Sequence, residues 1–176
     1  MKYIVKIFVV TFFLLASTFN ITFAEQKIVV LDMTYVLNQS KAGKGAQDFL
    51  KKSLTNNQKK FKDIESSLKK EEADLLGKKT VLSQEEYQKK TDVLRKKVID
   101  YQSQRRSALD KIAKQRAESR KALIEKIDPI LRDYIKENDI SLVIDKKHML
   151  GGKPDNDITK IIVERLNKEL PSLNLK

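Results

Sequence analysis

The chain has 176 residues, with 36 Lys/Arg, 24 Asp/Glu, a net charge of +12 and no cysteine. The lack of cysteine excludes a disulfide framework, a thiolate metal site and a cysteine nucleophile. The positive charge is concentrated in residues 41–136, which carry 26 Lys/Arg against 15 Asp/Glu.

The first 24 residues have the pattern of a secretory signal. Lys2 and Lys6 precede an apolar run over residues 7–16, and the small residues Thr22 and Ala24 occupy positions −3 and −1 of a cleavage site. The apolar run is shorter than the roughly 20 residues of a membrane span, which disfavours the alternative of an uncleaved anchor. We expect export, with cleavage after Ala24.

Two short β-branched runs at opposite ends of the mature chain predict strands. Residues 27–33 (KIVVLDM) and 141–145 (SLVID) contain too few residues for helices and are typical of buried strands. Residues 34–39 after the first run predict a short helical turn, and Ser40 is a candidate cap for the helix that follows.

Residues 41–127 predict long amphipathic helices. Apolar or small residues recur there in steps of three and four, which is typical of a helix that packs against another helix. They are Leu50, Leu54, Phe61, Ile64, Leu68 and Leu75, then Tyr87, Thr91, Leu94, Val98, Tyr101, Ala108 and Ile112. The first segment, residues 41–77, would extend about 55 Å as a helix.

The stretch LGKKTVLSQEEYQKK, residues 76–90, predicts the turn between two helices. Gly77 is expected to close the first helix in the left-handed conformation, and Ser83 with Glu86 has the pattern of a capping box. A short polar link favours antiparallel helices, so we expect a hairpin of residues 41–77 and 84–127. One continuous rod with a tolerated glycine is the alternative.

The remaining residues predict the rest of a small body. Asp128-Pro129 indicates a kink or restart where the second helix returns to this body. Residues 148–151 are predicted as a third strand, residues 151–154 as a loop, and residues 158–169 as a last helix capped by Asp157 or Thr159. A body of about sixty residues is marginal alone, so we expect an obligate oligomer.

No pattern in the chain indicates catalysis. Residues 41–46 (KAGKGA) contain a Gly-Lys pair, but Asn38 and Gly45 stand where a phosphate-binding loop needs Gly and Ser/Thr. The sole histidine, His148, has no companions at ligand spacing. We expect no enzyme activity, no cofactor and no metal site.

The order and spacing of several segments carry a resemblance. A signal peptide is followed by IVVLDMTYVL (28–37), by SKAGKGA (40–46) at the start of a long charged hairpin, by SLVID (141–145), and by DIT (157–159) before a final helix. In this arrangement the chain resembles the OmpH family, the Skp-type periplasmic chaperones. The resemblance extends over essentially the whole mature chain.

The resemblance implies an α+β fold that is mainly α, assembled as a jellyfish-like homotrimer. Residues 25–40 and 128–176 would form a body with a shared β-barrel, and residues 41–127 of each subunit a helical-hairpin tentacle. The tentacles would enclose unfolded outer-membrane proteins in the periplasm. The implied function is an ATP-independent holdase that prevents aggregation of these clients on their way to the outer membrane.

Some hairpin residues are candidates for this binding because they lie beyond the apolar stripe that pairing of the two helices requires. The apolar candidates are Leu76, Val81, Leu82, Val93 and Ile99. The basic candidates, for acidic clients or anionic lipid, are Lys89, Lys90, Arg95, Lys96, Lys97, Arg105 and Arg106. The alternatives are an exported structural coiled coil, which would use its whole seam in pairing, and a basic protein that binds nucleic acid or lipopolysaccharide. We expect no nucleic acid partner, because export removes it and aromatic residues for stacking on bases are sparse.

Overall fold

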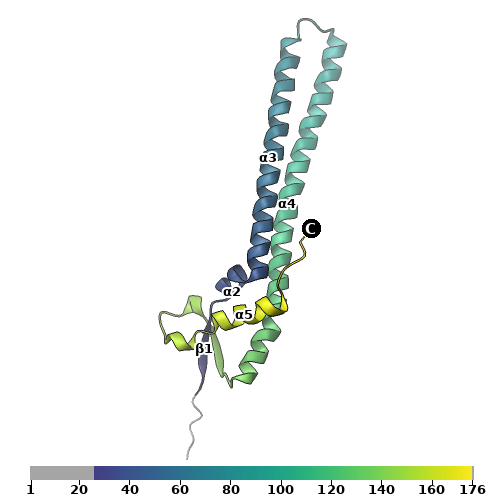
Figure 1. Ribbon diagram of the computed structural model, residues 1–176. Helices are drawn as coiled ribbons and strands as arrows, with labels where there is room; N and C mark the ends of the chain where they lie inside the picture. Colours follow the sequence, from purple (N-terminus) through teal and green to yellow (C-terminus); the bar gives the residue numbers. More distant parts are fainter. Residues whose placement is uncertain (1–25, 176) are drawn as a thin grey trace, which may run out of the picture.

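The computed structural model of the chain describes residues 26–175. A long helical hairpin rises from a small body that contains the strands and the shorter helices (Figure 1). This architecture confirms the mainly α fold with a hairpin on a small β-containing body. The signal peptide predicted at residues 1–24 lies outside the described residues.

The body contains a parallel two-stranded sheet made from segments far apart in the chain. β1 (Ile28–Leu31) pairs with β2 (Leu142–Asp145), and Ile28 lies opposite Leu142 in the register. Both strands lie within the predicted runs. The whole hairpin is inserted between the two strands, so their pairing brings the two ends of the hairpin together.

One face of this sheet packs on helices. Three helices surround this face: α2 (Met33–Gln39), the C-terminal part of α4 (Gln84–Glu137) and α5 (Thr159–Glu169). The core between them and the sheet includes Val29, Leu31 and the half-buried Val143. Other buried members are Val36, Leu37, Leu123, Ile127, Ile130, Ile162 and Leu166. Ile28 and Leu142 belong to the opposite face and are 40% and 52% exposed.

A tight elbow joins α2 to the first long helix, α3 (Lys41–Gly77). Ser40 caps α3, as predicted, because its side chain accepts a hydrogen bond of 3.2 Å from the Gly43 amide. A Cβ on Gly43 would lie 1.9 Å from the Leu37 carbonyl oxygen. Glycine is therefore required at this position for the elbow to close.

α3 and α4 form the predicted antiparallel hairpin, and the single-rod alternative is wrong. Figure 1 shows the two helices side by side along the length of α3, with α4 continuing into the body. The capping box at the start of α4 is present, since Ser83 Oγ accepts from the Glu86 amide and the Glu86 carboxylate accepts from the Ser83 amide.

The predicted left-handed conformation of Gly77 is wrong. Gly77 is the last residue of α3, and none of the glycines in residues 26–175 has a positive φ. The chain leaves through Lys78, whose amide donates to the Leu75 carbonyl at 3.1 Å, and Lys79 donates to Leu76 at 3.2 Å. These tighter bonds satisfy the last carbonyls, so no left-handed residue is needed.

Of the kink or restart predicted at Asp128-Pro129, the restart is wrong, because α4 continues through Pro129 to Glu137. The kink stays a prediction. Pro129 is exposed, whereas Ile127 and Ile130 beside it are 1% and 2% exposed. Burial of these two side chains offsets the hydrogen bond that proline removes. The Asp128–Arg132 ion pair spans the same turn.

The third strand predicted at residues 148–151 is absent from the described part of the chain. The Asp145 carboxylate accepts from the Lys147 amide at 3.1 Å and turns the chain into a 3₁₀ helix, η1 (Lys146–His148). A loop and a second 3₁₀ helix, η2 (Pro154–Asn156), follow. The predicted last helix is confirmed as α5, but its N-cap position is Ile158 rather than Asp157 or Thr159.

Candidate functional site

The seam between α3 and α4 is tightly packed only near the body. Ala42, Ala46 and Leu50 on α3 are at most 7% exposed. Phe61 on α3 and Ile112 on α4 are the last buried seam residues toward the tip, and every residue from 62 to 111 is half-buried or exposed. The interface between the two helices therefore stays partly exposed to solvent in the outer part of the hairpin.

Side-chain contacts still hold the outer helices together. The rings of Phe61 and Tyr101 meet edge to face, with centroids 6.0 Å apart. Nearer the tip, Lys97 Nζ on α4 lies 2.6 Å from the Glu71 carboxylate on α3. Such exposed ion pairs contribute little stability, so the outer hairpin depends mainly on the half-buried seam residues.

Four of the five predicted apolar binding residues are exposed. Val81 in the turn is 81% exposed, Leu76 at the end of α3 is 59% exposed, and Val93 and Ile99 on α4 are each 58% exposed. Leu82 is half-buried, and its amide donates to the Lys78 carbonyl at 3.0 Å. The structure thus places three candidates at the tip and two along α4.

One flank of outer α4 combines basic and apolar groups. Lys89, Val93 and Lys97 follow each other at one-turn intervals, and Lys90 lies on the same side. These residues border a groove of about 410 Å³ whose other wall contains Glu71, Asp74 and Leu75 of α3, together with Lys78 just after it. The groove offers apolar contact beneath ammonium groups.

The opposite flank carries Arg95, Ile99 and Arg106, because steps of four and seven residues return to one side of a helix. Arg105 lies closer to the seam and borders a small groove beside Phe61. The basic candidates therefore do not form one cluster; the structure distributes them over both flanks, with Lys96 between.

Several basic candidates are already paired with carboxylates. Lys89 lies 2.7 Å from Glu85, and Arg95 lies 3.3 Å from Asp92. Within residues 26–175, Lys96 and Arg106 make no ion pair and leave their charge open to a ligand. Elsewhere on α3, a hydrogen bond and the charge of Lys69 lower the pKa of Glu65.

Sequence reasoning missed a third groove, which lies at the base of the hairpin. It has a volume of about 700 Å³ and lies where α2, α3 and α4 meet. Its charged residues are Lys51, Arg116 and Arg120. The spacing of Arg116 and Arg120 beside the seam residue Ile112 was a usable signal, but the groove requires the register of α3 on α4.

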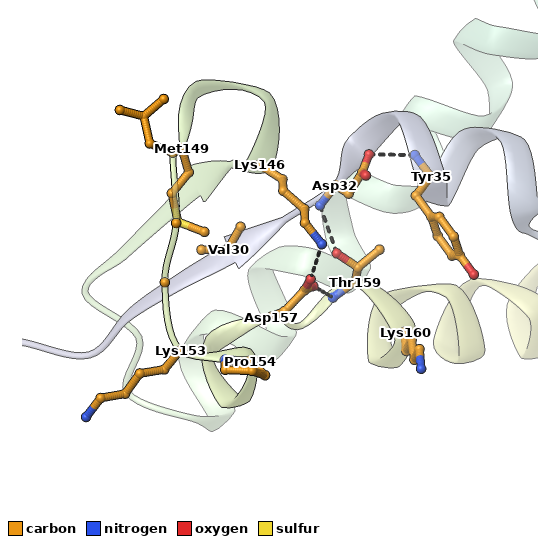
Figure 2. Close-up of a pocket in the computed structure, with 13 residues that line it drawn as sticks. Val30, Asp32, Tyr35, Lys146, Met149, Lys153, Pro154, Asp157, Thr159 and Lys160 are labelled. Carbon is orange, nitrogen blue, oxygen red and sulfur yellow. Dashed lines mark hydrogen bonds and ion pairs between the residues drawn. The ribbon is translucent and has the colours of Figure 1, made fainter.

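A polar network in the body holds β1 to the start of α5 (Figure 2). Lys146 Nζ lies 2.7 Å from Asp157 Oδ2, and Asp157 Oδ1 accepts from the Thr159 amide at 2.9 Å. Thr159 Oγ1 in turn accepts from the Asp32 amide at 2.8 Å. These residues border a pocket of about 590 Å³ between β1 and the loop after η1.

The network shifts the ionisation of its charged members. Partial burial raises the pKa of Asp157, but hydrogen bonds from Lys146 and Thr159 outweigh it and leave this pKa below its ordinary value. The hydrogen bond to Asp157 raises the pKa of Lys146. All four groups have internal partners, which indicates a structural role.

Two further observations concern only residues 26–175. No helix in this range is both long and apolar enough to cross a bilayer. The same range contains no group of three or more His, Cys, Asp or Glu side chains placed to hold a metal ion.

The structure defines a distinctive class of protein: a small strand-containing body that carries a charged helical hairpin with a partly solvent-exposed interface. The chain belongs to the OmpH-like outer membrane protein family, whose pattern matches residues 27–166. This membership confirms the resemblance drawn from the sequence.

Individual relatives agree with this assignment. A Skp-like protein of Pseudomonas aeruginosa strain PAO1 is 26% identical over 146 residues, covering 83% of this chain and 87% of the relative. The crystal structure of an OmpH-like protein of Caulobacter crescentus CB15 has a TM-score of 0.80 at 16% identity. That match covers 87% of this chain and 90% of the other, and it shows a shared fold.

Proposed function

We propose that this protein is an ATP-independent periplasmic holdase, a chaperone that binds unfolded outer-membrane proteins and prevents their aggregation. One observation carries the proposal: no residue from 62 to 111 is buried, while Val81, Val93 and Ile99 are more than half exposed. A hairpin that served only as a structural coiled coil would consume its apolar groups in pairing. The relative from C. crescentus is itself described as an OmpH-like outer membrane chaperone.

Weak contacts distributed along the hairpin suit a client without fixed structure. Apolar side chains of the client would cover Val93 and Ile99, and acidic ones would meet unpaired cations such as Lys96 and Arg106. Each contact is labile, but several arms acting on one chain hold it by avidity. Binding the unfolded chain lowers its free concentration, and with it the rate of aggregation, without nucleotide hydrolysis.

We propose a homotrimer in which the bodies share a β-barrel. A two-stranded sheet is marginal in water, and here its outer face exposes Ile28 and Leu142. Pairing between subunits would cover this apolar face and satisfy the strand edges. Three copies follow from the resemblance to the family, and three hairpins would enclose the client cavity.

The division of the chain follows from the same proposal. Residues 1–24 would direct export and be removed after Ala24. Residues 25–40 and 128–176 would assemble the trimer, and residues 41–127 would hold the client. The basic flanks would also favour an anionic surface, such as lipopolysaccharide, as a secondary partner.

The proposed function is tested by diluting a urea-unfolded outer-membrane β-barrel protein into buffer and recording its turbidity. We expect the purified protein to suppress aggregation at near-stoichiometric amounts without added nucleotide, and light scattering to give a trimer mass. Undiminished aggregation with a correctly folded trimer would exclude the holdase function.

A further inference from the structure

The groove at the base of the hairpin differs in its charge from the groove near the tip. Lys51, Arg116 and Arg120 are the charged residues that border it, and all three are positive. In residues 26–175 none of the three makes an ion pair, whereas Lys97 at the tip is paired with Glu71. The three cations of the base groove are therefore available to bind carboxylates of a ligand.

The wall of this groove is partly apolar beneath its cations, and Asn38, Gln39 and Gln47 also line it. Leu50 and Leu54 of α3 face Ile112 and Leu123 of α4, and small residues at positions 43, 46 and 119 leave the space between the helices open. A ligand that complements it must combine apolar side chains with negative charge.

The spacing of the arginines is compatible with an extended ligand chain. Arg116 and Arg120 are one helical turn apart, a rise of about 6 Å over four residues. In an extended chain, side chains two residues apart lie on one face at a separation of about 7 Å. Two carboxylates on alternate residues can therefore meet both guanidinium groups, which bind carboxylates in a bidentate manner.

We propose that this base groove binds an extended segment of an unfolded client in which acidic and apolar side chains alternate. The inference rests on the proposed function, because strands of outer-membrane barrels alternate apolar and polar residues. It goes beyond that function by assigning a segment preference to one groove. The exposed tip provides general apolar contact, and the base groove selects acidic alternating segments.

The test measures fluorescence anisotropy of short labelled peptides on the purified protein. One peptide alternates leucine with glutamate, a second alternates leucine with lysine, and a third alternates serine with glutamate. We expect the leucine–glutamate peptide to bind at least about tenfold more tightly than either of the other two. Equal binding of the serine–glutamate peptide would mean that charge alone acts, and would overturn the inference.

The variant R116E/R120E should weaken the leucine–glutamate peptide by about tenfold or more. The matched control K111E/K126E makes the same change in net charge on other parts of α4, and should weaken it less than about twofold at physiological salt. R116Q/R120Q, which removes charge without reversing it, should weaken binding by an intermediate factor. Equal loss in the control variant, or no loss in R116E/R120E, would overturn the groove assignment.

Two further measurements separate this inference from the holdase function. If R116E/R120E changes the molecular mass in light scattering, a neighbouring subunit covers the groove and the inference fails. If the unaltered protein suppresses aggregation but R116E/R120E binds the peptide normally, only the groove assignment fails. If the unaltered protein does not suppress aggregation, the holdase function fails, whatever the peptide does.

Discussion

Phe61 of α3 meets Tyr101 of α4 edge to face at a centroid distance of 6.0 Å, where the buried part of the hairpin seam ends. Phe61 is 6% exposed, and no residue beyond it on α3 is buried. The ring pair thus marks the boundary between a packed base and a loosely packed outer hairpin.

Replacing this ring should loosen the outer hairpin without unfolding the body. We expect Phe61→Ala to destabilise local hairpin packing by about 3 kcal/mol, because it removes a buried aromatic side chain. Amide hydrogen exchange should accelerate over residues 62–100 and remain slow in α5. Tyr101→Phe keeps the ring contact and should leave exchange nearly unchanged; equal acceleration in both variants would contradict the boundary.

The exposed apolar residues should act in binding and not in stability. Because Val81, Val93 and Ile99 are more than half exposed, changing all three to serine should alter thermal stability little. Client affinity should fall by about a hundredfold, since each of the three side chains contributes on the order of 1 kcal/mol when the client buries it. The measurement is titration of a labelled unfolded β-barrel protein.

A control for these substitutions lies in the body. Ile161 on α5 is 40% exposed and distant from the tip in the chain fold, so Ile161→Ser should leave client affinity unchanged. If Ile161→Ser lowers affinity as much per residue as the hairpin substitutions, binding is not confined to the hairpin.

The elbow at Gly43 should tolerate no side chain. Gly43→Ala places a Cβ against the Leu37 carbonyl oxygen and should destabilise the protein by about 2 kcal/mol. Gly45→Ala, two residues away, meets nothing within 4 Å and should stabilise α3 by up to about 1 kcal/mol. Chemical denaturation of both variants tests this opposite sign, and a similar effect at both sites would contradict the close approach.

The Lys146–Asp157 pair should make body stability depend on acid. The pKa of Asp157 is lowered in the folded state, so its ionised form stabilises the fold. This contribution to the free energy of unfolding is fully present above the ordinary carboxyl pKa of about 4, and it disappears as pH falls through the lowered pKa of the folded state. Asp157→Asn should therefore lower the melting temperature at pH 7 and show less further loss between pH 5 and pH 2.

A neighbouring carboxylate provides the comparison for this pH dependence. Asp155 is exposed and makes no ion pair in the described part of the chain, so Asp155→Asn should melt like the unaltered protein throughout. If Asp155→Asn and Asp157→Asn have the same melting curve at every pH, the network around Thr159 does not carry the acid dependence.

Local patterns were sufficient to predict much of the fold. The seam residues and the Ser83–Glu86 capping box are encoded within a few turns, and the β-branched runs that form β1 and β2 are equally local. The errors at Gly77, Pro129 and residues 148–151 arose where other interactions outweighed residue preference. Pro129 is tolerated because Ile127 and Ile130 are held in the body core, which no local pattern reveals.

The candidate site was predicted only in part for a similar reason. The exposure of Val93 and Ile99 could be predicted from their position off the seam. The base groove could not be predicted in this way, because Lys51 and Arg116 are brought together by the pairing of α3 with α4. A sequence gives the face of each helix more readily than the register between two helices.

The central claim is that unfolded polypeptide contacts the hairpin and not the face of the body that carries α5. Its most direct test is a photo-crosslinking amino acid placed at position 93 on α4 or at position 161 on α5, with an unfolded outer-membrane β-barrel protein as client. We predict crosslinks from position 93 that vanish when the client is first folded in detergent, and few from position 161. Equal crosslinking from both positions, or none from position 93, would contradict the claim.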